Sequence, residues 1–124
     1  MIDFNNGKAF KLSKGKEKNI PKNLLELLIP GENIVEYYSG IRDYVVFTDK
    51  RIIACNVQGF TGSKQDFTSI PYAKIQAFSV ESAGTFDMDS ELTLSLSGLG
   101  TVKFEFSSGS NIRAIGQTIG AYIL

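Results

Sequence analysis

The sequence of 124 residues contains no histidine and a single cysteine, and each of these facts limits the functions that the protein can have. Histidine is the commonest general base and the commonest metal ligand, so its absence argues against an enzyme and against a metal centre. We therefore expect no catalytic residues, no metal site and no cofactor. Cys55 has no second cysteine with which to pair, which is typical of a protein kept in a reducing compartment.

The chain also lacks a net charge and a long apolar run. Thirteen basic residues balance thirteen acidic ones, so no overall field attracts nucleic acid or an anionic membrane. A small asymmetry lies under this balance, because residues 1–30 hold six Lys against three acidic residues. No run approaches the roughly 18–20 apolar residues of a membrane-spanning helix, and the N-terminus does not resemble a secretory signal. We expect a cytoplasmic protein without a nucleic-acid partner.

What the chain does contain is the composition of one globular domain, with 43% hydrophobic and 21% charged residues. Residues 1–19 are polar and show no sustained period, so we expect a mobile N-terminal segment ahead of a domain spanning residues 20–124. Phe4, Phe10 and Leu12 would nevertheless suffice for a short packed stretch. The segment "NIPKNLLELLIPGE" then predicts a helix of two turns that Pro21 opens and Pro30 ends.

From Ile34 onward, apolar and polar residues alternate, which predicts β-strands. We expect seven of them, at residues 34–41, 44–48, 51–57, 65–72, 75–82, 91–98 and 101–107. The last two alternate most clearly, and Gly98-Leu99-Gly100 joins them as a hairpin. The tail "SNIRAIGQTIGAYIL" repeats apolar residues every three or four positions and predicts an amphipathic helix, in which Gly116 and Gly120 would let a neighbouring backbone come close.

Seven antiparallel strands must protect their edges, and two bent sheets that close into a barrel do so. The terminal helix is placed to cap one open mouth of that barrel. We therefore predict a mainly β fold, a barrel or roll of seven antiparallel strands capped by a C-terminal α-helix, with a short N-terminal helix. This is the pleckstrin-homology (PH) architecture.

Three stretches carry a resemblance to a known family: "GENIVEYYSGIRDYVVFTDKRIIACNVQGF", "SIPYAKIQAF" and "ELTLSLSGLGTVKFEF". They resemble the bacterial PH-like domain family, formerly a domain of unknown function. The resemblance covers about residues 20–124, and "FTDKRII" and "IPYAKI" are its most recognisable pieces. It implies a PH barrel that assembles into ring-like homo-oligomers, and it implies little about molecular function.

Five residues are candidate contacts for a partner or ligand: Arg42, Lys50, Arg51, Phe60 and Lys64. Lys50 and Arg51 could clamp a phosphate, because Arg offers a bidentate fork. The simpler interpretation is that Asp49-Lys50 forms the turn of a hairpin whose polar residues meet water.

Phe60 lies near the tip of a Gly-containing loop, with Lys64 beyond it. It could anchor a protein partner, or it could fold back over the core. Arg42 lies next to Asp43 in the loop where phosphoinositide-binding PH domains collect several basic residues. One positive charge beside one negative charge will not hold an inositol polyphosphate, so the shared fold does not bring lipid binding to this chain.

Other candidate sites have simpler structural interpretations. Cys55 alternates with aliphatic residues, which indicates a buried structural thiol. Asp87 and Asp89 have the D-x-D spacing of a cation site but lack the rest of an EF-hand loop, so we expect a solvated acidic turn. Five strand aromatics, more than one small barrel is expected to hide, predict an apolar surface for subunit contact. They are Tyr37, Tyr38, Tyr44, Phe47 and Phe78.

The sequence therefore predicts a non-catalytic PH-like module that forms homo-oligomers, with the docking of a protein or peptide as a further hypothesis. The alternative is a peripheral membrane adaptor that binds anionic lipid headgroups. Its support is the Lys-rich segment of residues 8–22, since basic residues near an anionic surface contribute about 1 kcal/mol each.

Overall fold

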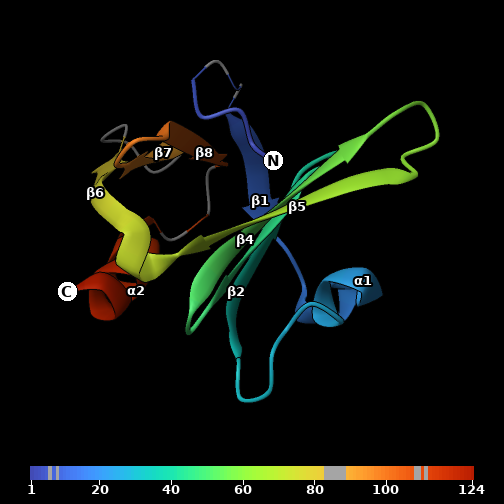
Figure 1. The fold of residues 1–124 in the computed structure, drawn as a ribbon, viewed down its shortest axis with the longest axis horizontal. Helices are drawn as coiled ribbons and strands as arrows, with labels where there is room; N and C mark the ends of the chain where they lie inside the picture. The colour runs from blue at the N-terminus through green and yellow to red at the C-terminus, as the bar shows by residue number, and fades with distance from the viewer. Residues whose placement is uncertain (6, 8, 83–88, 108–109, 111) are drawn as a thin grey trace.

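A single curled β-sheet dominates the computed structural model, which describes residues 1–5, 7, 9–82, 89–107, 110 and 112–124 (Figure 1). Its strands are β1 (Phe10–Lys14), β2 (Ile34–Ser39), β3 (Tyr44–Thr48), β4 (Arg51–Gln58), β5 (Lys64–Pro71), β6 (Ile75–Glu81), β7 (Ser90–Leu96) and β8 (Gly100–Phe106). The helical elements are α1 (Lys22–Leu25), α2 (Ile112–Ile123) and two 3-10 turns, η1 (Glu17–Asn19) and η2 (Tyr72–Lys74). The strand order is β5-β4-β3-β2-β1-β8-β7-β6.

The mainly β, PH-like fold with a C-terminal helix is confirmed, but the described strands number eight and not seven. The additional strand is β1, which pairs antiparallel with β2 and parallel with β8. It therefore joins the β2–β5 half of the sheet to the β6–β8 half, and the prediction of an all-antiparallel barrel was wrong at this one junction. β1 and β8 run in the same direction across the sheet, so their pairing is parallel.

The alternation of apolar and polar residues that predicted β7 and β8 also decides which of their side chains are buried. Their apolar residues face the core, namely Leu92, Leu94, Leu96, Val102, Phe104 and Phe106. In α2 the helical period places Ile115 and Ile119 in the same core, as an amphipathic helix requires. At the far end of α2 the ring of Tyr122 stacks on Tyr72 at 5.1 Å. The helix thus caps one mouth of the curled sheet.

The strand aromatics do not form an exposed surface, and this prediction was wrong. All five residues of β3 are buried, because the strand is covered on both faces. Tyr38 and Phe47 face the main core, whereas Tyr37 and Tyr44 face a second core that Ile20 and Leu24 of the α1 region cover. Phe78 is half-buried against the main core. The short apolar helix therefore hides the outer face that was expected to meet a second subunit.

Part of the N-terminal segment is also packed. Ile2 and Phe4 are buried in the main core. The Ile2 amide donates to Thr68 Oγ1 of β5 at 3.0 Å, and the Thr101 amide of β8 donates to the Phe4 carbonyl at 3.0 Å. These bonds tie the start of the chain to both halves of the sheet. Among the described residues, no helix is long and apolar enough to cross a membrane.

Candidate functional site

Two loops meet at one end of the β2–β5 half and form a surface that we call the tip, residues 40–43 and 59–64. Arg42 Nη2 donates a hydrogen bond to the Gly59 carbonyl, which fixes the β2–β3 loop against the β4–β5 loop. Asp43 adds a second tie, because its Oδ1 accepts from the Val57 amide at 3.1 Å. The tip is therefore a joined structure and not two independent loops.

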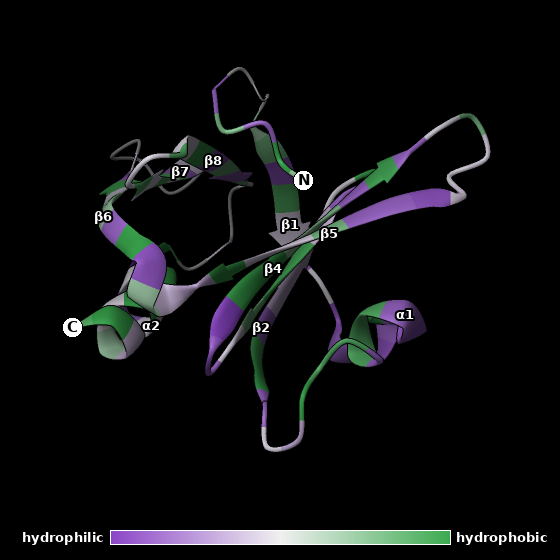
Figure 2. Cartoon of the chain, in the orientation of Figure 1, coloured by the Kyte–Doolittle hydropathy of each residue, from purple (hydrophilic) through white to green (hydrophobic). Residues whose placement is uncertain are grey.

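Fully exposed apolar side chains lie on the tip. The relative exposure of Ile41 is 102% and that of Phe60 is 110%, so neither side chain is covered by the described residues. Phe60 does not fold back over the core. The β4–β5 arm projects from the body, and its end is mostly neutral with one hydrophobic stretch, while β5 is hydrophilic along much of its length (Figure 2). Lys64, at the start of β5, is exposed on the same arm.

The other two candidate contacts, Lys50 and Arg51, lie at the opposite end of β3 and β4. Lys50 is exposed at the hairpin turn, where Thr48 Oγ1 accepts from the Lys50 and Arg51 amides at 3.0 Å each. Arg51 points inward instead. Its Nε and Nη2 donate to the two oxygens of Glu32 at 2.9 Å each.

Further bonds use the rest of the Arg51 guanidinium. Nη2 also donates to the Leu27 carbonyl at 2.9 Å, and Nη1 donates to Ser69 Oγ at 3.0 Å. The Glu32 side chain has no exposed area. Burial raises the pKa of Glu32, but hydrogen bonds from Arg51, Thr48 and the Ile29 amide, with the charge of Arg51, lower it to about 2. To clamp a phosphate, Arg51 would have to leave this carboxylate buried and unpaired.

The structure thus brings Arg42, Phe60 and Lys64 together and leaves Lys50 and Arg51 apart from them. Ile41 completes the tip and was not among the predicted contacts. The sequence placed Ile41 at the end of the predicted strand of residues 34–41, whereas β2 ends at Ser39 and leaves Ile41 in the loop.

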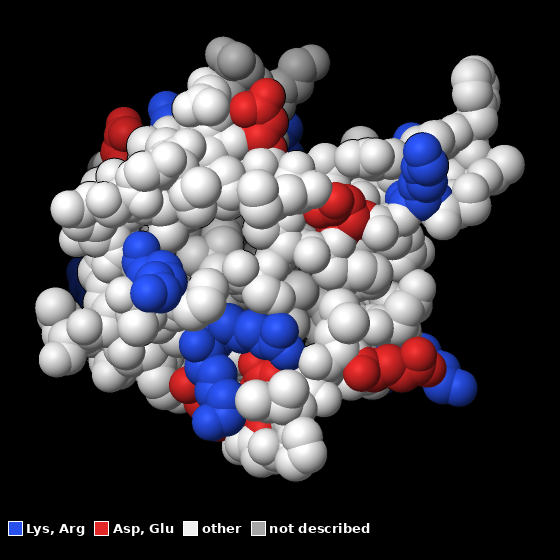
Figure 3. Space-filling model, viewed as in Figure 1, with Lys and Arg blue, Asp and Glu red and all other residues white. Residues whose placement is uncertain are grey.

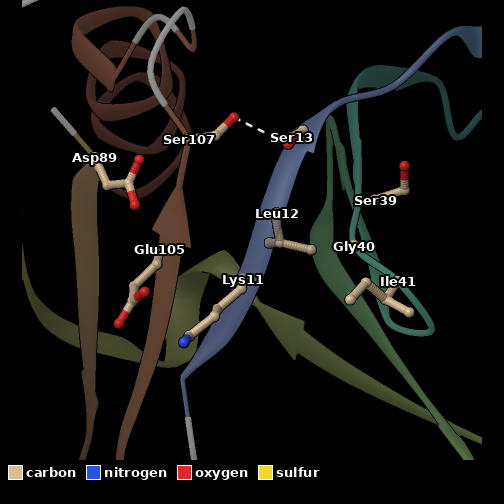
Figure 4. A pocket seen from close by; sticks show the side chains of 9 residues that line it. All are labelled: Lys11, Leu12, Ser13, Ser39, Gly40, Ile41, Asp89, Glu105 and Ser107. Carbon is tan, nitrogen blue, oxygen red and sulfur yellow. Dashed lines mark hydrogen bonds between the residues drawn. The ribbon is translucent and has the colours of Figure 1, made fainter. Parts of the chain in front are cut away.

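A hollow of about 400 Å³ adjoins the tip, between β1 and β8 on one side and the β2–β3 loop on the other (Figure 4). Lys11 and Glu105, which are partners in the β1–β8 register, extend into it, and Ser107 Oγ donates to Ser13 Oγ at 2.9 Å. A neighbouring hollow shares Lys11, Ile41 and Glu105 and reaches Arg42. Charged groups of both signs line these hollows, among them Lys11, Arg42, Asp43 and Glu105.

Acidic residues gather on the outer face of β6–β8. Glu81 pairs with Glu91, and Glu91 pairs with Glu105, in the strand register. Lys103 Nζ lies 3.8 Å from Glu91 Oε1. The described residues contain no group of three or more His, Cys, Asp or Glu side chains placed to hold a metal ion. Asp89 is exposed, and Asp87 of the D-x-D motif lies outside the described residues.

Cys55 is buried in β4, as predicted. Burial is the main cause that raises the pKa of its thiol. A buried thiol with a raised pKa is a poor nucleophile, because the thiolate is the reactive form. Cys55 therefore packs in the second core as a buried thiol of low reactivity.

Comparisons with known proteins agree with this geometry. The family described as Bacterial PH domain matches residues 3–123. The uncharacterized protein YjqA of Bacillus subtilis (strain 168) is 42% identical over 82% of this chain and 83% of its own length. YozO of the same organism, also an uncharacterized protein, is 33% identical over 76% of this chain and 81% of its own length.

Solved structures show the same likeness. A DUF1696 family protein with a pleckstrin-homology domain from Shewanella loihica PV-4 is 36% identical, with a TM-score of 0.80 over 94% of this chain and 100% of that chain. A pleckstrin homology domain from Shewanella amazonensis SB2B is 43% identical, with a TM-score of 0.65 over 82% of this chain and 83% of that chain. The family match, the two relatives and the shared fold lead to one conclusion: this chain belongs to the bacterial PH domain family.

Proposed function

We propose that this bacterial PH domain is a non-catalytic module of the cytoplasm that assembles into homo-oligomers and docks a protein or peptide partner. The tip carries the assembly part of the proposal. Ile41 and Phe60 are completely exposed on loops that the bond from Arg42 to the Gly59 carbonyl holds together. Fixed aromatic and aliphatic groups beside an arginine are the features that protein interfaces concentrate.

A second apolar surface supports assembly from another side. Leu25, Leu27, Ile29 and Val35 are 42–53% exposed along the chain from α1 into β2. Contact between the tip of one copy and this stretch of the next would be heterologous, because it joins two different surfaces. Repeated heterologous contacts close into a ring when the rotation allows it, which is the assembly that the family resemblance implies.

Light scattering after size-exclusion chromatography tests assembly directly. One chain has a mass of 13.6 kDa. We expect at least twice that mass at a protein concentration of about 100 µM, where contacts of micromolar affinity are populated. The double variant Ile41→Ser/Phe60→Ser should lower that mass. Leu99→Ser is the matched control, because Leu99 is a 49% exposed apolar residue on a different hairpin. A monomeric wild-type protein would contradict the assembly proposal.

The lipid-binding alternative has a specific observation in its favour, which is the basic segment from the last residue of β1 to the first residue of α1. Lys14, Lys16, Lys18 and Lys22 are all exposed, whereas basic and acidic groups are interspersed on the face shown in Figure 3. Sedimentation with phosphatidylserine vesicles separates the alternatives. Binding that is lost when these four Lys are changed to Gln, with the oligomer mass unchanged, would support the membrane adaptor. Equal sedimentation with neutral and anionic vesicles would end it.

A further inference from the structure

Strand β6 presents a sheet edge with little protection. Among the described strands, β6 pairs with β7 alone and β5 with β4 alone. Unpaired edges usually carry charged residues or proline, which discourage another strand from pairing with them. β5 follows this rule with Lys64, Asp66 and Pro71. β6 carries one charge, Glu81 at its end, and has neither a charge nor a proline from residue 75 to residue 80, most of which are exposed. The β6 main chain is therefore available to a further strand.

A groove runs beside this edge and follows α2. It has a volume of about 660 Å³ and is lined by Val80, Ser82, Ser110, Ile112, Arg113, Gly116 and Gln117. α2 contacts β6 and continues to η2, where Tyr122 stacks on Tyr72, so the helix runs alongside the strand (Figure 1). Val80 pairs with the buried Leu92 and thus points toward the helix side of the sheet. A strand added to β6 would direct every second side chain into the same groove.

Two glycines lie one turn apart on α2. A Cβ on Gly116 would lie 3.1 Å from Val80 Cγ2, so this glycine lets α2 approach β6. A Cβ on Gly120, one turn further, would have Leu124 Cδ1 at 3.8 Å as its one neighbour within 4 Å among the described residues. The sequence predicted that a neighbouring backbone comes close to both glycines. β6 does not come close to Gly120.

A basic side chain at the groove indicates the chemistry of its occupant. Arg113 lines the groove, is exposed and makes no ion pair within the described part of the chain. A carboxylate complements its charge.

We propose that an extended peptide segment of a partner protein binds as an additional strand on β6, with alternate apolar side chains in the α2 groove and a carboxylate at Arg113. Main-chain hydrogen bonds to β6 supply affinity, and the groove and Arg113 supply specificity. This inference rests on the docking part of the proposed function and gives it a site. It does not involve the tip or the assembly contact.

The probe is a phage library of random twelve-residue peptides, selected on the purified protein, from which enriched sequences are synthesised. We expect enrichment of alternating β-branched or aromatic residues with an Asp, Glu or free C-terminus at one end. Amide shifts in the 15N-labelled protein should concentrate in residues 75–82 and in the first half of α2. Selection that enriches nothing, or peptides that shift the tip instead, would overturn the proposal.

N-methylation of the synthetic peptide tests strand pairing without altering the protein. Residues whose amides face β6 should lose affinity by about tenfold when methylated, since each loses a main-chain hydrogen bond, and the residues between them should tolerate it. Arg113→Gln should weaken binding by roughly threefold to fivefold, as for a partly solvated ion pair. Lys103→Gln, on the outer face of β8, should leave it unchanged. Uniform tolerance of methylation would overturn the proposal.

Assembly is measured on the same samples so that the two proposals fail separately. Arg113→Gln should leave the mass in solution unchanged. If the protein is a homo-oligomer and no peptide is enriched on it, the strand site is refuted and the assembly proposal stands. If the protein is a monomer and binds a peptide in a methylation-sensitive way, the assembly proposal is refuted and the strand site stands. Protection of the β6 amides from hydrogen exchange that rises with protein concentration, without peptide, would assign the edge to a second copy and overturn the proposal.

Discussion

The guanidinium of Arg51 holds the buried carboxylate of Glu32 through two hydrogen bonds of 2.9 Å. Glu32 belongs to the connection between α1 and β2, and Arg51 begins β4. The pair therefore links the α1–β2 connection to the β3–β4 hairpin. Thr48 joins them, because its hydroxyl donates to Glu32 Oε2 at 2.7 Å. A basic turn that resembles an anion clamp in the sequence is thus a structural link between two layers.

This ion pair should make stability depend on pH. The pKa of Glu32 is about 2 in the folded protein and near the ordinary 4.5 in the unfolded chain. The unfolded state therefore binds the proton more tightly between these values, and the stabilisation, complete above about pH 4.5, is lost as the pH falls toward 2. Glu32→Gln should lower the free energy of unfolding by about 3 kcal/mol at pH 7.

Urea denaturation at pH 7 and at pH 2.5 checks this prediction. The difference between wild type and Glu32→Gln should shrink at the lower pH, because there the Glu32 carboxyl of the unfolded chain is protonated while that of the folded protein stays largely ionised. Glu26→Gln is the matched control, since Glu26 is exposed at the end of α1. An equal difference at both values would show that the charge of Glu32 does not contribute.

Most of the fold could be predicted, because strands from Ile34 onward keep one face apolar over five or more residues. β1 was missed although Phe10 and Leu12 are buried between exposed Lys11 and Ser13. Its alternation lasts five residues and lies in a Lys-rich stretch, so it does not stand out. The burial of β3 on both faces was also missed, since only contact with α1 decides it.

The site was less predictable for a related reason. Phe60 was named because an aromatic residue at a loop tip is visible in a sequence. That Arg42 contacts the Phe60 loop depends on two hairpins lying side by side, and that Arg51 faces Glu32 depends on where the irregular connection after α1 passes. Such tertiary pairings leave no local period. The same basic residue type is a surface contact at one end of β3 and a buried link at the other.

Gly98 and Gly100 give a matched pair for the N-terminal contact. Both have positive φ, at 78° and 124°, so an alanine is strained at either position. A Cβ on Gly98 would meet nothing within 4 Å, whereas a Cβ on Gly100 would lie 2.5 Å from the Phe4 carbonyl oxygen. Gly98→Ala should therefore cost about 1 kcal/mol.

Gly100→Ala should cost clearly more, because it also displaces Phe4 from the bond with Thr101 and from the core. Thermal unfolding of both variants measures the difference, and hydrogen exchange of the Thr101 amide should rise in Gly100→Ala alone. Equal losses of stability would show that residues 1–5 do not pack on β8 in solution.

The Cys55 thiol should not react with thiol reagents in the folded protein. It is completely buried, and burial raises its pKa, so little thiolate forms and no reagent reaches it. Ellman's reagent at pH 8 should label native protein only as fast as the chain unfolds, and in urea it should label one thiol per chain at once. Rapid labelling of native protein would contradict the packing of β4 in the second core.

Two buried tyrosines should respond unequally to the loss of a hydroxyl. The Tyr72 hydroxyl donates to the Thr48 carbonyl at 2.7 Å in the interior, whereas the buried Tyr44 hydroxyl lies beside the Cys55 thiol, which is a weak hydrogen-bonding group. Tyr72→Phe leaves the Thr48 carbonyl unsatisfied and should destabilise the protein by about 1–2 kcal/mol. Tyr44→Phe removes only a weak contact with a thiol, so the loss of stability should be smaller. Urea denaturation compares the two, and a loss at Tyr44 as large as that at Tyr72 would contradict this difference.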